Sequence, residues 1–473
     1  MARTKNKINF HFTRAFIIIV FILFVLLISI EPHEATASIF QMKNFTLSGY
    51  HRLLIFAPHE DDETLGQGGL IQRALAQGMA VHVVIETNGD GNMFATMEEF
   101  RKAFPAAKDY IRMGDIRQQE SLAALKVLGV LKENVTFLSY PDRGTPELWI
   151  RHWSASNPYE SNFTESTRSP YAVTFNPQSN FSGEDLLKDI RTILADFQPD
   201  LILYPNPEDV HPDHRGMSDF VRLAVHLERL NVTGYNPTEL TYLVHRPKFP
   251  IPHGYLPDTA LLPPQALYDS NPNWYKFDLT ADEVVRKNEA VSQYKSQLPS
   301  LRGLLESFVR SNELFATLDT PTLPIISSGV LLEPTTWMKS DGTVVTLVER
   351  DPIRDATMRA AIGAGDLVAM YAAEAPDRML YVCAETRGEV KALFTYYIQI
   401  KAYNGTLFSD YTFKFGGILG KDTRAYAKGN FVCGSVGLHT LGNPLFIMAS
   451  AEVQSESLVT LDRMAWQLID IPN

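Results

Sequence analysis

A short apolar run, Leu53–Phe56, leads into a turn, His59–Glu63, that holds one imidazole and four carboxylates within five residues. A glycine-rich stretch with helical spacing follows, so the local order is buried strand, polar turn and helix. That order places the turn at the carboxyl end of a strand, where open α/β sheets bind ligands. Crowded carboxylates repel one another, and a bound metal cation offsets that repulsion. The stretch therefore predicts an α/β fold with a metal site beside its first strand.

A second polar cluster follows another strand-like run, Leu201–Tyr204. It contains two histidines three residues apart, His211 and His214, with Pro212 fixing the backbone between them. Two histidines and one carboxylate, with a position left open for water, are the ligand set of a catalytic zinc site. We expect one of the two imidazoles to be a ligand and the other to act as an acid or base.

Together the two clusters resemble the signature of the PIG-L/LmbE-like zinc-dependent N-deacetylases. That family pattern is a His-Pro-Asp-Asp-Glu turn followed much later by His-x-Asp-His. The resemblance covers roughly residues 50 to 315 and departs at Glu60, where the family usually has Pro. It implies removal of acetyl groups from glycolipids containing N-acetylglucosamine, from mycothiol and bacillithiol precursors, or from related amino sugars.

Carried over position by position, the resemblance implies a role for each polar residue of the two motifs. The implied zinc ligands are His59, Asp62 and His214. Asp61 would be the general base, and His211 the acid that stabilises the oxyanion. Asp213 would orient His211 and raise its pKa. The implied cofactor is therefore Zn2+.

Four further residues are candidates for contacts with the substrate. Arg117 lies on a predicted helix with Glu120, and the family has an Arg at this spacing that approaches the substrate. An exposed ion pair within that helix is an equal alternative, and such pairs contribute little. In the family an Asp near Asp142 contacts the sugar. Arg143 beside it, and Asn88 in the polar turn after the second strand, would suit the hydroxyl groups of an amino sugar.

Other interpretations compete with a catalytic deacetylase site. Either cluster alone also suits a solvated turn at a helix start, where Asp and Glu are favoured. A structural zinc site often uses cysteine, but Cys383 and Cys433 lie far from both clusters. The rival functions are another zinc-dependent amide or ester hydrolase, and a carbohydrate-binding surface protein that works through its C-terminal part. Asp61 favours an enzyme, since a binding protein has no need of a proton-transfer residue.

Strand-like and helical segments alternate through the first two thirds of the chain. This order predicts a Rossmann-like, mostly parallel sheet with helices on both faces. We also expect a helix at about Leu304–Leu314 and a linker at Thr320–Pro324. Short β-branched runs separated by Gly and Asp-Gly turns then predict a C-terminal all-β, sandwich-like domain. The expected divisions are a signal peptide or membrane anchor at 1–37, a deacetylase domain at 48–318 and a β-rich domain at 325–473.

The net charge of −11 argues against a nucleic-acid partner, which would need a basic face. Basic residues come first in the N-terminal segment and an apolar run follows: Arg3, Lys5, Lys7 and Arg14, then Ala15–Ile28. This order predicts a secretory signal, or an uncleaved anchor that would make the membrane a partner. We therefore expect an extracytoplasmic protein, either membrane-anchored or secreted. Its two cysteines would form a disulfide or remain as two buried thiols.

Overall fold

Apolar runs buried on both faces build the central sheet of the computed structural model. The structure describes residues 42–268, 273–345, 348–353, 355, 363–416, 425–457 and 459–472. The strands of the sheet are β1 (Lys43–Asn44), β2 (Arg52–Ala57), β3 (Ala80–Thr87), β4 (Val135–Tyr140), β5 (Leu201–Pro205), β6 (Thr238–Tyr242), β7 (Trp274–Asp278) and β8 (Asn312–Ala316). They lie in the order β1-β7-β8-β6-β5-β2-β3-β4. The two pairings that β8 makes are antiparallel and the others are parallel, which confirms the mostly parallel sheet.

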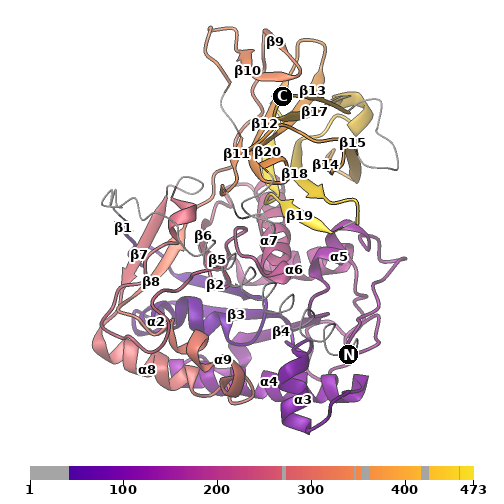
Figure 1. Ribbon diagram of the computed structural model, residues 1–473. Coiled ribbons are helices and arrows are strands. Elements are labelled where there is room, and N and C mark those ends of the chain that lie inside the picture. Colours follow the sequence, from indigo (N-terminus) through magenta and orange to yellow (C-terminus); the bar gives the residue numbers. More distant parts are fainter. Residues whose placement is uncertain are drawn as a thin grey trace, which may run out of the picture. The chain divides into compact units, whose positions relative to one another are not determined.

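Helices cover both faces of this sheet (Figure 1). They are α2 (Asp62–Ala76), α3 (Met93–Phe100), α4 (Ala107–Leu128), α5 (Thr145–Ile150), α6 (Gly183–Phe197), α7 (Pro212–Asn231), α8 (Ala281–Val291) and α9 (Leu298–Glu306). α2, α4 and α8 pack on one another, and α6 packs on α7 against β5. Local capping sets where several helices begin. At the start of α6, for example, the Ser182 side chain accepts a hydrogen bond from the Asp185 N–H.

The helix expected at about Leu304–Leu314 is wrong. α9 ends at Glu306, and the following residues form β8, which pairs with β7. The deciding contacts are long-range: the fully buried Glu313 carboxylate accepts the Gly69 and Leu70 N–H groups at 2.7 and 2.8 Å. It also lies 2.8 Å from Lys287 Nζ. Local helical spacing could not show these partners, and tertiary contacts override helix propensity.

The C-terminal β module, residues 328–470, is built of β-strands, as the sequence predicts, and its described strands pair only in the antiparallel direction. Its strands are β9 (Ser328–Val330), β10 (Glu333–Met338), β11 (Glu349–Arg350), β12 (Leu367–Glu374), β13 (Met379–Thr386), β14 (Thr395–Tyr403), β15 (Phe408–Gly416), β16 (Ala425–Lys428), β17 (Phe431–Gly437), β18 (Phe446–Gln454), β19 (Thr460–Arg463) and β20 (Gln467–Asp470). β9 pairs with β10, and two five-stranded sheets, β11-β12-β13-β17-β16 and β15-β14-β18-β19 with β20, make up the rest. Inward-facing residues of these two sheets share one apolar core, which is the arrangement of a sandwich.

The segment expected to be a linker packs against the β module. Leu323 is 1% exposed, and its N–H donates to the Asp470 carbonyl at 2.7 Å. From α7, the Arg222 guanidinium donates to the Asp319 carbonyl at 2.8 Å and to the Trp466 carbonyl at 3.2 Å. A second apolar core contains side chains of the α/β sheet, of its helices and of β18 and β20. The β module and the α/β part therefore share a packed interface.

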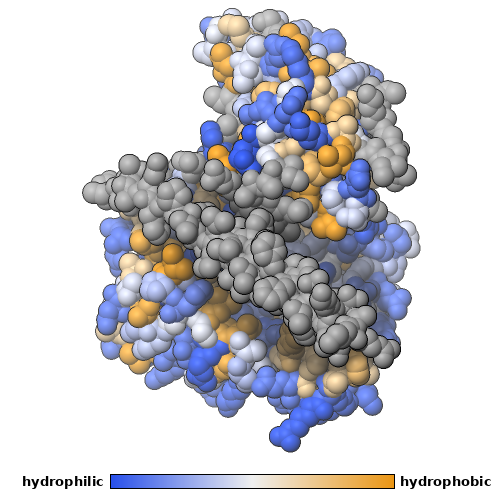
Figure 2. Space-filling view, in the orientation of Figure 1, coloured by the Kyte–Doolittle hydropathy of each residue, from blue (hydrophilic) through white to orange (hydrophobic). Residues whose placement is uncertain are grey.

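Two expectations concern the cysteines and the N-terminus. Cys383 on β13 and Cys433 on β17 lie directly opposite each other and form a disulfide. The predicted signal or anchor, residues 1–37, lies outside the described residues. Within the described part, we find no helix with the length and apolarity needed to cross a membrane. Figure 2 shows hydrophilic side chains over much of the visible coloured surface, with apolar patches between them.

Candidate active site

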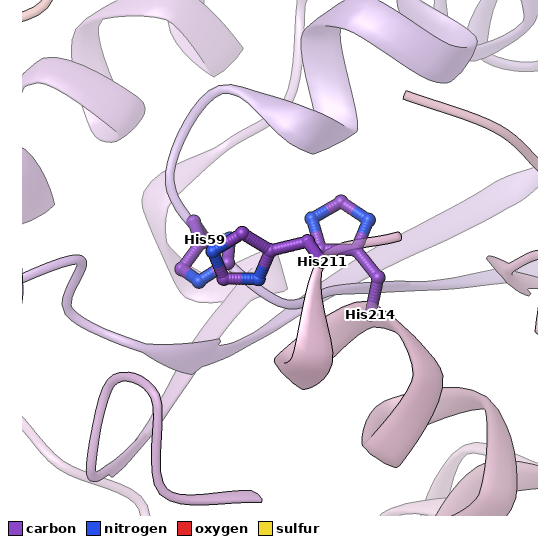
Figure 3. A group of neighbouring side chains, drawn as sticks. All are labelled: His59, His211 and His214. Carbon is purple, nitrogen blue, oxygen red and sulfur yellow. The ribbon is translucent and has the colours of Figure 1, made fainter. Parts of the chain in front are cut away.

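The two polar clusters meet at one edge of the sheet. β2 and β5 are neighbouring parallel strands, so their carboxyl ends lie side by side. His59 follows β2, while His211 precedes α7 and His214 lies in its first turn. Figure 3 shows the side chains of His59, His211 and His214 gathered in one region. One ring nitrogen from each lies within 4.8 Å of the other two.

The predicted ligands have the chemistry and burial of a metal site. Asp62 Oδ2 lies 3.2 Å from His59 Nδ1 and 3.0 Å from His214 Nε2. The contact with His214 lacks hydrogen-bond geometry, and among the described residues Asp62 Oδ1 and both His214 nitrogens have no hydrogen-bond partner. Unpaired buried polar atoms are costly, and two imidazoles with one carboxylate are a zinc donor set. The donor types therefore fit a zinc ion, and the groups whose ligand atoms all lie within 4.8 Å of one another are His59 with His211 and His214, and Asp62 with His214 and His245.

The pKa values of the predicted ligands His214 and Asp62 are shifted by the charges of their neighbours. Burial lowers the pKa of His214, but Asp209 and Asp62 raise it to about 10. Burial opposes ionisation of Asp62 as well, yet the charge of His214, together with the hydrogen bond and charge of His59, holds its pKa well below the usual range. Negative charge at the site thus attracts a cation. A metal ion would compete with the protons on these imidazoles.

Asp61 occupies a special backbone position in the turn. Its φ of 117° is in the left-handed region, which a non-glycine residue keeps only when its surroundings enforce it. The Asp61 N–H donates to Glu63 Oε2 at 3.0 Å, and Glu63 is held by the hydroxyls of Ser121 at 2.6 Å and Tyr294 at 2.9 Å. Burial raises the pKa of Asp61 to about 8 against the opposing effect of Arg117. The turn therefore holds a carboxyl group suited to proton transfer beside the predicted metal ligands.

Asp213 makes its hydrogen bonds away from His211. Its Oδ2 lies 3.9 Å from His211 Nδ1, but 3.2 Å from His59 Nε2. The same carboxylate accepts the N–H groups of Arg143 at 2.7 Å and Thr145 at 3.2 Å. Burial, together with the positive charges of the neighbouring histidines, lowers the pKa of His211 well below its ordinary value. The role expected for Asp213, orienting and charging His211, stays a prediction.

Arg117 is part of the site, and the alternative of an exposed ion pair is wrong. Its side chain is buried, and it donates to the Gly89 carbonyl at 2.9 Å and the Glu60 carbonyl at 2.6 Å. Its Nη2 lies 3.5 Å from Asp61 Oδ2. Glu120 instead accepts hydrogen bonds from the N–H and hydroxyl of Ser296. From α4, Arg117 thus holds the His59–Glu63 turn in place through the Glu60 carbonyl.

Of the other substrate candidates, two have buried side chains and one has an exposed side chain. Asp142 Oδ2 accepts the Gly91 N–H at 2.7 Å, and its Oδ1 lies 3.6 Å from His59 Nε2. Asn88 is fully buried, and neither of its amide atoms has a partner among the described residues. The side chain of Arg143 is exposed, and its backbone N–H is what reaches the site. The structure thus places Asp142 beside the predicted ligand His59, while Arg143 contributes through its backbone.

Residues 54–225 match the family described as PIG-L, GlcNAc-PI de-N-acetylase. This segment is a PIG-L family domain. The chain is 26% identical over 191 residues to a glucosamine-6-phosphate deaminase-like protein of Bacteroides thetaiotaomicron, an alignment that covers 38% of this chain and 28% of that protein. It is 28% identical over 179 residues to a 1D-myo-inositol 2-acetamido-2-deoxy-alpha-D-glucopyranoside deacetylase of Rhodococcus opacus, which covers 37% of this chain and 53% of that enzyme. The chain thus spans about half or less of the length of these curated relatives.

Among solved structures, the chain is similar to an N,N'-diacetylchitobiose deacetylase from Pyrococcus horikoshii. The identity is 20%, the alignment covers 57% of this chain and 85% of that one, and the TM-score is 0.37. A similarity of this degree says nothing about the substrate of this chain.

Two residues that the sequence reasoning missed complete the surroundings of the ligands. Asp209, within the PIG-L domain, lies 3.1 Å from His214 Nδ1 and accepts the N–H groups of Val244, His245 and His211. A carboxylate behind a ligand histidine fixes the orientation of the ring. Asp209 could have been found, because it lies two residues before His211 in the polar run. His245, beyond the matched range, comes within 4.8 Å of Asp62 and His214, and no spacing in the sequence marks it.

Two arginines join the β module to the loop between β5 and α7. Arg215 donates to the Pro207 carbonyl at 3.2 Å and to the Arg463 carbonyl at 2.7 Å. Arg246 donates to the Glu208 carbonyl, and its other amino group donates to Asp355 at 3.1 Å. The loop that carries the second motif of the PIG-L domain is therefore connected to the β module through both Arg215 and Arg246.

Proposed function

We propose that this chain is a zinc-dependent N-deacetylase that hydrolyses the N-acetyl group of a glycan or glycolipid containing N-acetylglucosamine. One observation carries the proposal: the buried ligand set of His59, Asp62 and His214 stands directly beside Asp61. The PIG-L match supports the reaction class, because its description names a de-N-acetylase. The Rhodococcus opacus relative, named as a deacetylase of an acetamido sugar, supports an amino-sugar substrate.

In the proposed reaction the chain's own groups move the protons. A zinc ion held by the three ligands supplies Lewis acidity and lowers the pKa of water. Asp61 takes a proton from the attacking water, whose oxygen forms a bond to the acetyl carbon. The carbon–nitrogen bond then breaks, and the amine receives the proton from Asp61. The immediate products are acetic acid and the free amine of the sugar, and one proton passes from the acid to the amine to give acetate and an ammonium group, so atoms and charge balance.

His211 is assigned to the developing oxyanion. Its ring centroid lies 4.6 Å from that of His59, and its side chain is 23% exposed, so it can face a bound acetamide. Burial lowers its pKa, which favours the neutral imidazole in the free protein. We therefore assign the hydrogen bond to the oxyanion to His211 and proton delivery to Asp61. A donor aimed at an oxyanion contributes about a hundredfold to a thousandfold in kcat.

The sugar is proposed to bind beside Asp142 and Asn88. Asp142 is buried next to His59, and the amide of Asn88 has no partner among the described residues. Buried polar groups of this kind are usually paired, so hydroxyl groups of a substrate are suitable partners for them.

We also propose that the protein is exported. Two observations support this: the basic residues followed by an apolar run within residues 1–37, and the disulfide between Cys383 and Cys433. Disulfides persist in oxidising compartments and are rare in the cytosol. Cell fractionation with protease accessibility tests the proposal. A protein found only in the cytosol with both thiols free would refute it.

The deciding experiment is acetate release by the full-length protein from a panel of N-acetylglucosamine glycans and glycolipids. Activity should disappear with a chelator and return with zinc. Asp61→Asn should keep zinc and lose at least about a hundredfold in rate, since a positioned base contributes that much. Asp115→Asn, a change at an exposed acid on α4, is the matched control.

Each alternative outcome has a distinct meaning. Bound zinc without acetate release would point to another amide or an ester as the substrate. Full activity of zinc-loaded Asp61→Asn would overturn the assignment of the base. Glycan binding without any zinc binding would favour a carbohydrate-binding protein.

A further inference from the structure

A second group of carboxylates lies within the β module, close to the loop of the second motif. Asp351 and Asp355 follow β11, and Asp462 belongs to β19. One carboxylate oxygen from each lies within 4.8 Å of the other two. Oxygen ligands surround a calcium ion at about 2.3–2.6 Å, so three oxygens at this spacing can share one ion.

Two of the three carboxylates have a buried oxygen without a hydrogen-bond partner among the described residues, whereas both oxygens of Asp462 accept backbone N–H groups. Asp351 is 2% exposed, and its Oδ2 has no hydrogen-bond partner among the described residues. Asp355 uses Oδ2 to accept from Arg246, whereas its Oδ1 is also unpaired there. Nearby Glu208, from the loop of the second motif, is 4% exposed and has an unpaired Oε1. Buried polar atoms are normally satisfied, so these oxygens from separate segments are available to bind water or a cation.

Among the described residues, the nearby arginines are shared or paired elsewhere. Arg215, whose charge opposes the raised pKa of Asp351, donates to the carbonyls of Pro207 and Arg463. Arg246 is shared between Asp355 and Glu208. The Arg463 guanidinium pairs with Glu452 at 2.6 Å, and only its backbone N–H reaches Asp462. Burial raises the pKa of Asp462 to about 8 and that of Asp351 well above its usual value, with neighbouring carboxylates adding to both shifts. The group therefore needs either protons or a cation.

We propose that Asp351, Asp355 and Asp462 bind one Ca2+ ion, at a site separate from the catalytic metal. The three ligands offer only carboxylate oxygen, which suits hard cations and contrasts with the imidazole-rich catalytic site. Calcium is preferred over magnesium because it accepts several carboxylates in flexible geometry, whereas magnesium keeps most of its waters. A cavity of about 370 Å³, lined in part by Asp355 and Asp462, provides an entry path and room for water ligands.

The proposed ion would connect two parts of the β module to the loop of the second motif. It would join β19 to the segment after β11, and Asp355 reaches the Glu208 carbonyl through Arg246. Calcium binding would therefore stabilise the folded β module and its contact with the α/β part, without touching the reacting groups.

Calorimetric titration of the full-length, zinc-loaded protein with CaCl2 tests the proposal. We expect one Ca2+ per chain beyond the zinc and a rise in Tm with calcium. Asp351→Asn should weaken calcium binding at least about tenfold, since ligand charge sets the affinity of such sites. Asp377→Asn, a change at an exposed acid in the same module, should bind calcium like the wild type. Zinc content and acetate release should be unchanged in Asp351→Asn, so a failure here is distinguishable from a failure of the proposed function.

A second measurement covers the case in which Asp351→Asn does not fold. Tb3+ luminescence excited through tryptophan reports directly on the wild-type site, because Trp466 lines the same cavity. Displacement of Tb3+ by calcium at the zinc-loaded protein would support the proposal. Absence of calcium and Tb3+ binding, or calcium binding equal in Asp351→Asn and the wild type, would overturn it and leave protonated carboxyl groups as the explanation.

Discussion

Replacing Asp209 by Asn tests whether the carboxylate behind His214 sets the affinity of the metal site. In the structure Asp209 Oδ2 accepts the N–H groups of Val244 at 3.1 Å and His245 at 2.8 Å, and lies 3.1 Å from His214 Nδ1. Its Oδ1 accepts the His211 N–H at 2.9 Å. The Asp209 side chain thus contacts the predicted ligand His214, and it accepts hydrogen bonds from the backbone of His211 and from the segment after β6.

The contacts of Asp209 determine which way an Asn would turn. If the Asn NH2 group took the position of Oδ2, it would face two N–H donors, those of Val244 and His245. If it took the position of Oδ1, it would face only the N–H of His211. The second orientation is therefore favoured, and one donor–donor conflict costs about 1–3 kcal/mol of stability. His214 keeps an oxygen neighbour but loses the negative charge. Loss of such a partner typically weakens metal binding about tenfold to a hundredfold, which is about 1.4–2.7 kcal/mol.

The assay is competition for zinc between the full-length protein and a chromogenic chelator, with acetate release measured at limiting and saturating zinc. Zinc affinity of Asp209→Asn should fall by the stated factor. Activity should recover only in part at saturating zinc, because the backbone N–H of His211 also loses the carboxylate oxygen that accepts it. Asp196→Asn, on the exposed face of α6, is the matched control. A folded Asp209→Asn protein with wild-type zinc affinity would refute the reasoning.

Three further predictions concern stability. Lys287→Met should cost about 3–5 kcal/mol in urea unfolding, because it leaves the buried Glu313 carboxylate without its ion partner; a loss below about 1 kcal/mol would contradict this. Replacing Cys383 and Cys433 together by Ala should cost about 2–4 kcal/mol by the same measurement, since the disulfide closes a loop with a sequence separation of 50; equal stability of the variant and the oxidised wild type would contradict this. Burial lowers the pKa of His82 in the folded protein. As the pH falls below about 6.5, the unfolded chain therefore binds a proton at His82 more readily than the folded protein does. The free energy of unfolding decreases as the pH falls further below that value. His82→Gln should therefore lose less Tm than the wild type between about pH 7 and pH 5; parallel Tm curves for the two proteins would contradict this.

Much of the α/β fold could be predicted because its signals are local. The run at Leu53–Phe56 is apolar on both faces because its strand lies inside a parallel sheet. Its polar turn marks the strand end, and Leu201–Tyr204 repeats the pattern. β8 could not be predicted in this way. Its conformation depends on pairing with β7 and on the contact between Glu313 and Lys287, which are distant in the sequence.

The same division applies to the site. His59, Asp61 and Asp62 are close in sequence, and the chemistry of a carboxylate-rich turn already indicates a metal. Arg117 was a candidate from its helix, but only packing shows that it donates to carbonyls of the catalytic turn. The position of His245 follows from the pairing of β5 with β6, which no local spacing encodes.

By itself, the sequence determined the order of strands and helices in most of the α/β part, the residues at the strand ends and the class of chemistry that those residues can perform. These features depend on the spacing of apolar residues and on the type of each side chain, and both can be read within a few neighbouring residues. The tertiary structure decided which distant groups meet: Asp209 with His214, Arg246 with Asp355, and Asp351 with Asp462. Such contacts arise because a folded chain must satisfy its buried charges with whatever partners packing brings near, however far apart they lie along the chain.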